Sequence, residues 1–487
     1  MKRWLVLVLP LTLAACINVG PDYRRPQLHP PQHWRGAGAD TQPIISGDWW
    51  KLFHDSTLDR LIDSALAQNR DLKIAAARVV EAQANLALAR SQQFPAFNMQ
   101  ANAVRNRATM NGTPALPVGT QAIANDYTAA GSAAFEIDFW GKFRRATEAA
   151  RASLLATEYA QQVTRLTLIA DAANAYFNLR SLDAQLQIAR RTLQSRRESL
   201  ALQQKRYHGG VVPELDVRQA EVDVQTAAVT IPGLENQIAT QENTLSTLLG
   251  RYPGNIVRGV TLADLTVPPQ VPAGLPSSLL ARRPDVLEAE QQLIAANADI
   301  GVAKAAYFPS ISLTGLLGVE SAQLASLFSA GSHIWQAGVG ATLPIFNAGA
   351  TGARVAAATA QQQQALQFYL RTVETAFADV DSALVAVRTT RQQYAAQHAQ
   401  VRTLQRTLKL ANLQYQNGAT AYLTVLDSER TLFSSELSAA QMRQAQLSAI
   451  VRLYTVLGGG WQTPPAASTT TSKSAIGTAP QRNVNPR

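Results

Sequence analysis

Few residues of this 487-residue chain are spaced for catalysis. The six histidines are scattered, and the pair His29 and His33 spans Pro30-Pro31, which prevents the helical turn that would align two imidazoles on a metal ion. The chain carries no Gly-x-Ser-x-Gly, P-loop or His-Glu-x-x-His motif. Its single cysteine excludes an intramolecular disulfide and a Cys-based zinc site. We therefore expect no enzyme activity, no metal site and no resident cofactor.

The single cysteine, Cys16, instead predicts a covalent modification. Two basic residues and an apolar stretch precede Leu13-Ala14-Ala15-Cys16, which resembles the lipobox of a bacterial lipoprotein signal peptide. We expect residues 1–15 to be removed and Cys16 to carry an S-diacylglycerol and an N-acyl chain such as palmitate, so that 16–57 is a lipid-anchored N-terminal segment. Ile17 is not Asp, and the sorting rule for such lipoproteins then favours the outer membrane.

A second group with possible chemistry is Leu423, Asp427 and Arg430, which fall at i, i+4 and i+7 on one face of a predicted helix. In a symmetric assembly these residues would form apolar and charged rings that narrow a pore. The alternative is an ordinary surface ion pair between Asp427 and Arg430, worth a few tenths of a kcal/mol.

The overall charge does not indicate a nucleic-acid partner. The formal net charge is +10, but charged residues make up only 16% of the chain and no block of five Lys or Arg occurs. There is also no run of 18 apolar residues, which excludes an ordinary membrane-spanning helix.

The sequence contains an internal repeat. The segment around Tyr207 matches that around Tyr415 at an offset of 415 − 207 = 208, and Phe94-Pro95 matches Phe308-Pro309 at 308 − 94 = 214. We expect one repeat at 58–250 and a second at 276–460, joined by a linker rich in Pro and Gly at 251–275. The tail, 461–487, is expected to be disordered.

Each repeat predicts helices much longer than those of globular domains. Apolar residues recur every seven positions from Ala172 to Tyr207 and from Val380 to Tyr415, which indicates coiled-coil packing. A helix of about 65 residues would be roughly 100 Å long. Each long helix turns at a tip and returns, and we expect a kink of the first returning helix at Pro232-Gly233. Shorter helices at 58–93 and 277–306 are predicted to stack end to end with the returning helices.

Between the short and long helices the apolar period changes to two. This predicts four strands, at about 96–107, 126–139, 310–320 and 335–344. A soluble sandwich and a membrane β-barrel share this pattern, and the lipobox favours the barrel. Four strands cannot close a barrel, so a homotrimer with 3 × 4 = 12 strands is expected.

Several motifs resemble those of the TolC/OprM-like outer-membrane efflux lipoproteins, the outer-membrane factors of tripartite efflux systems. They are the segments 16–26, 274–286 and 422–430. The resemblance implies an α+β membrane protein in which a trimeric 12-stranded barrel, four strands from each chain, is continued by a long helical coiled-coil barrel. It also implies outer-membrane lipid, a periplasmic adaptor and an inner-membrane pump of the resistance-nodulation-division type as partners.

The resemblance further assigns residues at the two tips. The family's periplasmic gate has its counterparts in Tyr415, Leu423, Asp427 and Arg430. Adaptor docking is expected at residues of the two tips: Gly209, Gly210, Val211, Pro213, Leu215, Asn417 and Gly418.

The expected function is a passive duct for small molecules such as drugs, which would contribute to antibiotic resistance. One alternative is a type I protein-secretion duct, which the lipobox and Arg282-Arg283-Pro284 disfavour. Another is a non-conducting coiled-coil scaffold of the envelope, which would leave the amphipathic strands unused.

Overall fold

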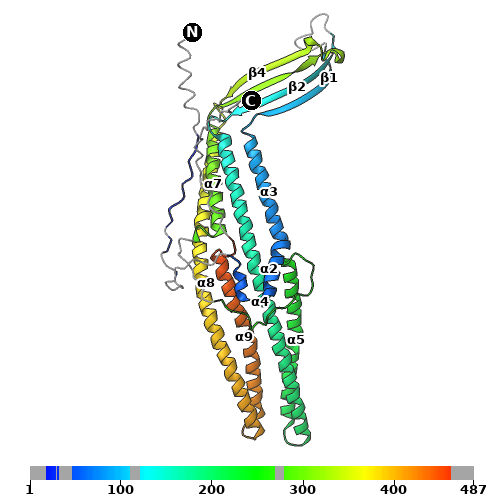
Figure 1. Cartoon of the computed structure of the whole chain (residues 1–487), viewed down its shortest axis with the longest axis vertical. Coiled ribbons are helices and arrows are strands. Elements are labelled where there is room, and N and C mark those ends of the chain that lie inside the picture. Colours follow the sequence, from blue (N-terminus) through cyan, green and yellow to red (C-terminus); the bar gives the residue numbers. More distant parts are fainter. Residues whose placement is uncertain are drawn as a thin grey trace, which may run out of the picture.

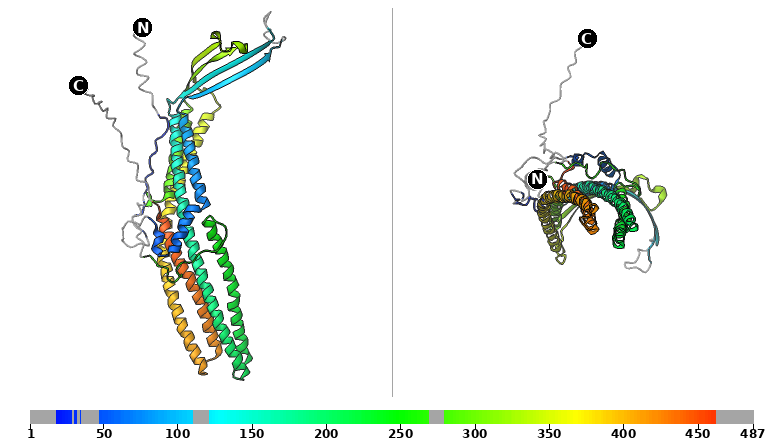
Figure 2. Two further views of the ribbon diagram at one scale, coloured as in Figure 1. Left: turned by 45° about the vertical axis from the view of Figure 1, so that its right-hand side comes forward. Right: turned by 90° about the horizontal axis from the view of Figure 1, so that it is seen from below.

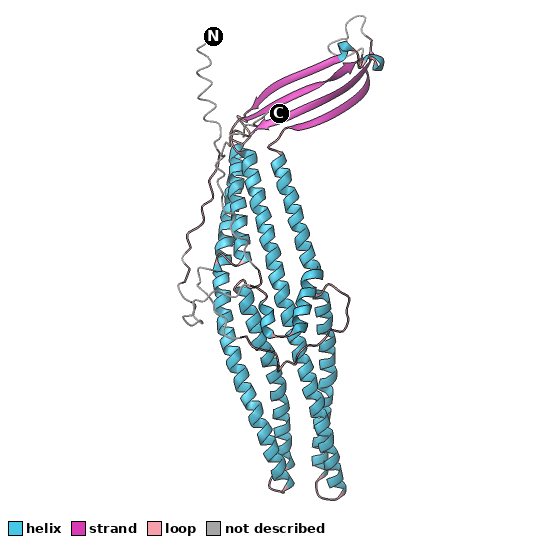
Figure 3. Ribbon diagram, in the orientation of Figure 1, coloured by secondary structure: helices cyan, strands magenta, loops and turns pink. Residues whose placement is uncertain are grey.

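The computed structural model describes residues 18–28, 30–31, 34, 47–109, 121–268 and 279–461. The signal peptide, Cys16 and the tail from 462 onward lie outside the described residues. The described part is long and narrow, with a β-sheet at one end and helices along the rest (Figure 1). Coloured by secondary structure, the strands and the long helices occupy separate regions (Figure 3).

The two predicted repeats are present in the order of the elements. The first contains α2 (Ser56–Gln68), α3 (Arg70–Ser91), β1 (Ala96–Arg107), β2 (Ile123–Ile137), α4 (Lys142–His208) and α5 (Glu214–Leu248). The second contains α7 (Pro284–Ala305), β3 (Ser310–Ser321), β4 (His333–Thr342), α8 (Ala350–Gln416) and α9 (Tyr422–Val456). Corresponding helices have equal lengths: 22 residues in α3 and α7, 67 in α4 and α8, and 35 in α5 and α9. The duplication is therefore confirmed.

The long helices run the whole length of the helical region. α4 contains neither Pro nor Gly, and its heptad positions Ala172, Leu179 and Leu193 are buried. α4 packs against α3, α5, α7 and α9, and α8 packs against α7 and α9. In Figure 1, α3 lies above α5 and α7 above α9, so two shorter helices together match one long helix, as predicted. At 1.5 Å per residue, 67 residues extend about 100 Å.

None of the described helices combines the length and the apolar character that a membrane span needs.

The short helices differ from their predicted bounds. The helix expected at 58–93 is divided at Asn69, which leaves helical geometry at ψ 137°. Asn69 caps α3 by accepting the N–H of Leu72 at 3.0 Å, and its Nδ2 donates to the carbonyl of Leu248 at 3.0 Å. In the described part of the helix expected at 277–306, Leu279 is helical, the chain leaves helical geometry at Arg283 before the proline, and α7 begins at Pro284.

α5 is one continuous helix through Pro232, the position at which the sequence predicts a kink. Pro232 is exposed and Leu234 beside it is buried, so packing holds the helix across the one backbone hydrogen bond that a proline removes. Trp461 was expected in the disordered tail, but its side chain is buried and its Nε1–H donates to the carbonyl of Arg282 at 2.9 Å.

The four strands form one antiparallel sheet in the order β1-β2-β3-β4. β2 and β4 begin and end about two residues before their predicted bounds, 126–139 and 335–344. The register pairs Phe97 with Ala133, Phe135 with Leu313, and Leu313 with Val339, so odd-numbered residues share one face of the sheet. The most exposed large apolar side chains of the strands belong to this face: Phe97, Met99, Leu317, Trp335 and Val339.

The main hydrophobic core lies at mid-height of the helical region. There the 3-10 helix η1 (Trp49–Phe53), α2 and the linker pack on α4, α5 and α9. Trp49 stacks on Tyr454 with ring centroids 5.3 Å apart, and the Tyr176 hydroxyl donates to Asp55 Oδ2 at 2.5 Å. We call this layer of packed elements the belt. The belt holds the two repeats together, which fixes the directions in which the two hairpins leave it.

Candidate functional site

The candidate site is formed by the two hairpin tips at the end of the molecule remote from the sheet (Figure 1). Seen from below, the lower helices lie along an arc in the order α8, α9, α4, α5 (Figure 2). The same order follows from their packing, since α8 contacts α9, α9 contacts α4 and α4 contacts α5. Each chain therefore brings two tips to one end, α4–α5 and α8–α9.

The two tips have the same backbone turn. In the first, Gly210 has φ +70° and the N–H of Val211 donates to the carbonyl of Arg206 at 2.9 Å. In the second, Gly418 has φ +70° and the N–H of Ala419 donates to the carbonyl of Gln414 at 2.8 Å. Both are helix ends closed by a left-handed glycine, which explains why glycine stands at these two matched positions.

The residues predicted for adaptor docking are all exposed at these turns: Gly209, Gly210, Val211, Pro213, Leu215, Asn417 and Gly418. Val211 and Leu215 are 65% and 62% exposed, which places two large apolar side chains in solvent at the first tip. An exposed apolar pair at the end of a long hairpin is a suitable contact for another protein.

The predicted gate residues of α9 share one face. Leu423, Asp427 and Arg430 are exposed, whereas Val425 and Leu426 between them are buried. The ion pair considered as the alternative, between Asp427 and Arg430, is not formed among the described residues. Arg430 reaches the other hairpin instead.

Arg430 Nε donates to Asp223 Oδ1 of α5 at 2.7 Å. The Asp223 side chain is only 2% exposed and that of Arg430 is 45% exposed. α5 and α9 make few other contacts, so this ion pair is the main polar link between the two returning helices near the tips. A hydrogen bond between charged groups with one side open to water contributes about 1–2 kcal/mol.

Tyr415 forms the second link between the hairpins. Its hydroxyl donates to Gln203 Oε1 of α4 at 3.0 Å, and Gln203 is buried. The Tyr415 ring lies 5.2 Å from that of Tyr422, and the guanidinium of Arg206 lies 4.7 Å from its centre. Burial raises the pKa of Tyr422 to about 12, so the Tyr422 hydroxyl stays protonated at physiological pH.

Behind these links lies a buried charged layer. Arg196 Nη1 donates to the carbonyl of Asp223 at 2.7 Å, while its Nε and Nη2 have no partner. Burial lowers the pKa of Arg196 and raises that of Glu429, whose Oε2 is also unpaired. Unpaired charged groups in a buried site are costly, so this layer is less stable than an apolar one would be.

The sequence patterns did not single out Asp223 or Arg196. A signal was present for Asp223, because Ala220, Asp223 and Ala227 occupy i, i+3 and i+7 on the buried face of α5. An acidic residue in such an apolar stripe needs a partner. The identity of the partner could not be read from the sequence, since Arg430 lies 207 residues away.

The described residues contain no group of three or more His, Cys, Asp or Glu side chains placed to hold a metal ion.

An amphipathic four-stranded sheet continued by long helices that end in polar-linked tips defines a channel subunit rather than a globular domain. The chain belongs to the outer membrane efflux protein family, whose model matches residues 61–251 and 275–459. These two ranges run close to the expected repeats 58–250 and 276–460. The protein is thus an outer-membrane protein of α+β fold.

Relatives match over nearly the whole chain. The cation efflux system protein CusC of Escherichia coli O6:H1 is 36% identical over 465 residues, which cover 94% of this chain and 99% of CusC. The toluene efflux pump outer membrane protein TtgI of Pseudomonas putida is 37% identical over 459 residues, 93% and 97% of the two chains. The CmeC outer membrane channel of Campylobacter jejuni is similar in structure, with a TM-score of 0.87, 27% identity and coverage of 91% and 95%.

Proposed function

We propose that this chain forms the trimeric outer-membrane channel of a tripartite efflux pump, a passive duct for small toxic molecules such as drugs. The observation that carries the proposal is the open sheet. β1 and β4 each have one neighbour, and the apolar face of the sheet is exposed. Unpaired strand edges are not tolerated in lipid, and three copies with 12 strands would close them.

The helical region supports the same assembly. In one chain the long and the stacked short helices form an arc. Its two borders are α8 on one side and α3 with α5 on the other (Figure 2). Three such arcs, joined border to border, would close a cylinder below the barrel. The hollow cylinder and the barrel would then share one axis, which is the geometry of a continuous duct.

The lipid on Cys16 is part of the proposal. The N–H of Val19 donates to the carbonyl of Trp140 at 3.1 Å, at the junction between β2 and α4. Cys16 is three residues before Val19 in the sequence, and three residues of chain extend at most about 11 Å. An acyl chain attached there would enter the bilayer that surrounds the sheet, which fits an anchor in outer-membrane lipid.

The tips would supply both the gate and the docking surface. Leu423, Asp427 and Arg430 would face the axis from each of three chains, with Tyr415 behind them. The Arg430–Asp223 and Tyr415–Gln203 links hold the hairpins together in the present conformation. A periplasmic adaptor, docked on the seven exposed tip residues, would open the duct by favouring a conformation in which these links are broken. An inner-membrane pump of the resistance-nodulation-division type would supply the energy.

Conductance in planar bilayers tests the duct and the gate. The purified protein should conduct, and Asp427→Ala with Arg430→Ala should increase the open fraction. Arg218→Ala is the matched control, because Arg218 pairs only within α5, with Glu214 and Glu221. No conductance in any variant would favour the non-conducting scaffold, and equal conductance of the double variant and the control would remove the gate assignment.

The cargo is tested in cells. A strain lacking the gene should become sensitive to drugs or metal ions, and the pattern with and without each candidate pump would identify the cargo. Unchanged susceptibility together with loss of a secreted polypeptide would instead support a type I secretion duct.

A further inference from the structure

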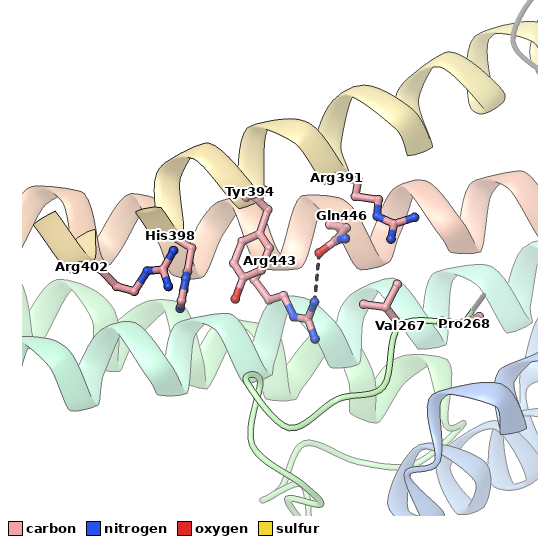
Figure 4. A pocket seen from close by; sticks show the side chains of 9 residues that line it. Val267, Pro268, Arg391, Tyr394, His398, Arg402, Arg443 and Gln446 are labelled. Carbon is pink, nitrogen blue, oxygen red and sulfur yellow. Dashed lines mark hydrogen bonds between the residues drawn. The ribbon is translucent and has the colours of Figure 1, made fainter. Parts of the chain in front are cut away.

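An open pocket of about 720 Å³ lies between α8, α9 and the linker, away from both the tips and the sheet (Figure 4). Its lining contains basic and neutral residues and no acidic one: Val267, Pro268, Arg391, Tyr394, Ala395, His398, Arg402, Arg443 and Gln446. The proposed channel function assigns no role to this pocket.

The basic residues of α8 line the pocket along one stripe because of their helical spacing. Arg391, Ala395, His398 and Arg402 stand at i, i+4, i+7 and i+11, which is one stripe of α8. Figure 4 shows Arg402 and His398 toward one end of the pocket and Arg391 toward the other. Arg443 of α9 lies between them, with its guanidinium 5.2 Å from the centre of the Tyr394 ring.

The charge of Arg443 is not balanced by any carboxylate among its hydrogen-bond partners. Its Nη1 donates to Gln446 Oε1 at 3.0 Å and its Nη2 to the carbonyl of Leu265 at 2.6 Å. Burial lowers the pKa of Arg443, because the charged guanidinium loses contact with water and no carboxylate compensates for that loss. A guanidinium in this position is stabilised by any anion that reaches the pocket.

The two arginines of α8 are also unbalanced. Arg391 and Arg402 are exposed and form no ion pair with a described residue. The nearby belt behaves differently, since Arg258 contacts both Asp183 and Glu242. The linker residues 269–278, which follow Pro268, contain no Asp or Glu in their sequence, so they cannot supply the missing charge.

We propose that this pocket binds a phosphate group through Arg391, Arg402 and Arg443, with His398 as an additional hydrogen-bonding group. The fork of each guanidinium fits two oxygens of a tetrahedral dianion, and three cations around one dianion would leave the site with less charge than it has when empty. The open side of the pocket leaves room for a larger molecule that carries the phosphate.

Binding of inorganic phosphate to the purified full chain in detergent, measured by calorimetry at constant ionic strength against chloride, tests this proposal. Arg391→Gln with Arg402→Gln should weaken binding about tenfold or more, because two charge-assisted contacts are lost. The matched control is Arg388→Gln with Arg406→Gln, which removes the same charge from exposed positions of the same helix outside the pocket. The control should change the affinity less than about twofold.

A phosphate ester of a sugar is the second arm of the experiment. Tighter binding of the ester than of inorganic phosphate would indicate that the group is carried on a larger molecule, and equal binding would indicate the free ion. Absence of phosphate binding by the unchanged protein would overturn the proposal, as would equal losses in the two double variants. If only the pocket variant loses its oligomeric state and phosphate does not bind, carboxylates of a neighbouring copy balance the arginines and the proposal is wrong.

Discussion

The two hairpin tips share a backbone and differ in side-chain chemistry. Leu215 of the first tip and Leu423 of the second occupy matched positions, and both are exposed. Where the second tip continues with Asp427 and Arg430, the first has Gln219 and Val222. The turn is therefore preserved between the two copies, whereas only the second hairpin carries the arginine, Arg430, that contacts Asp223 of the first. The comparison shows that the two tips share a backbone turn and differ in the side chains that link them.

The largest effect is expected from the link between α5 and α9. Arg430→Ala should shift the tip equilibrium toward the open form by about 1–2 kcal/mol, a factor of roughly 5–30. Single-channel conductance of the reconstituted protein measures this change. Arg218→Ala, which removes an exposed ion pair within the first hairpin, should leave the open fraction unchanged. An equal rise in both variants would mean that the two tips are equivalent.

Tyr415→Phe should have the next largest effect. The substitution removes the hydroxyl that donates to Gln203 Oε1. The buried amide oxygen is then left without this donor, at a cost of about 1 kcal/mol. The matched residue of the first repeat is Tyr207, which is 41% exposed. Tyr207→Phe should therefore be nearly neutral in the same conductance measurement. If the two substitutions behave alike, the Tyr415–Gln203 link does not contribute to closure.

Because the two turns have the same backbone, replacing the glycine of either turn should change the free energy of unfolding equally. Gly210→Ala and Gly418→Ala each force a Cβ into the left-handed region at φ +70°, while no atom lies within 4 Å of either Cβ position. Each should lower the free energy of unfolding by about 1 kcal/mol through backbone strain alone. Thermal unfolding followed by circular dichroism would detect both. A cost at only one of the two positions would show that the turns differ in a way that their hydrogen bonds do not reveal.

The smallest effect is a pH dependence. Burial raises the pKa of Glu429, so its protonated form favours the folded tip, and this stability is present at low pH and lost as the pH rises through the raised pKa. The melting temperature at pH 5 should exceed that at pH 7.5 by about 1–3 °C more in the unchanged protein than in Glu429→Gln. Glu221, at 429 − 208 = 221, pairs with Arg218, and Glu221→Gln should retain the difference. Equal differences in all three proteins would contradict a role for Glu429.

Much of the architecture could be read from short-range patterns. The heptads of α4 and α8, the period-two strands and the matched landmarks around Tyr207 and Tyr415 predicted the elements and their duplication, because helical and strand periods are local properties. Errors occurred where tertiary contacts override local signals. Asn69 ends α2 while bonding to Leu248, and Trp461 is held by Arg282. Neither contact has a signature in its own segment.

The candidate site also has one part that the sequence predicted and another that only the packing of the helices decides. Spacing placed Leu423, Asp427 and Arg430 on one helix face, and the exposed pattern of α9 agrees with it. Asp427 is the partner that helical spacing offers to Arg430, but Arg430 does not form its ion pair with Asp427. Asp223 takes that place because α5 and α9 both pack on α4, and a link across 207 residues is decided only by how the two repeats pack.

The sequence alone determined the periodic elements, the duplication and the positions of the glycine turns, since each depends on residues a few positions apart. Only the tertiary structure decided which charges meet. It paired Arg430 with Asp223, buried Arg196 and Glu429 behind them, and left the arginines of the α8–α9 pocket without a counter-ion. The physical reason is that electrostatic partners are chosen by distance in space and by exclusion of water, and both arise only when the long helices pack side by side.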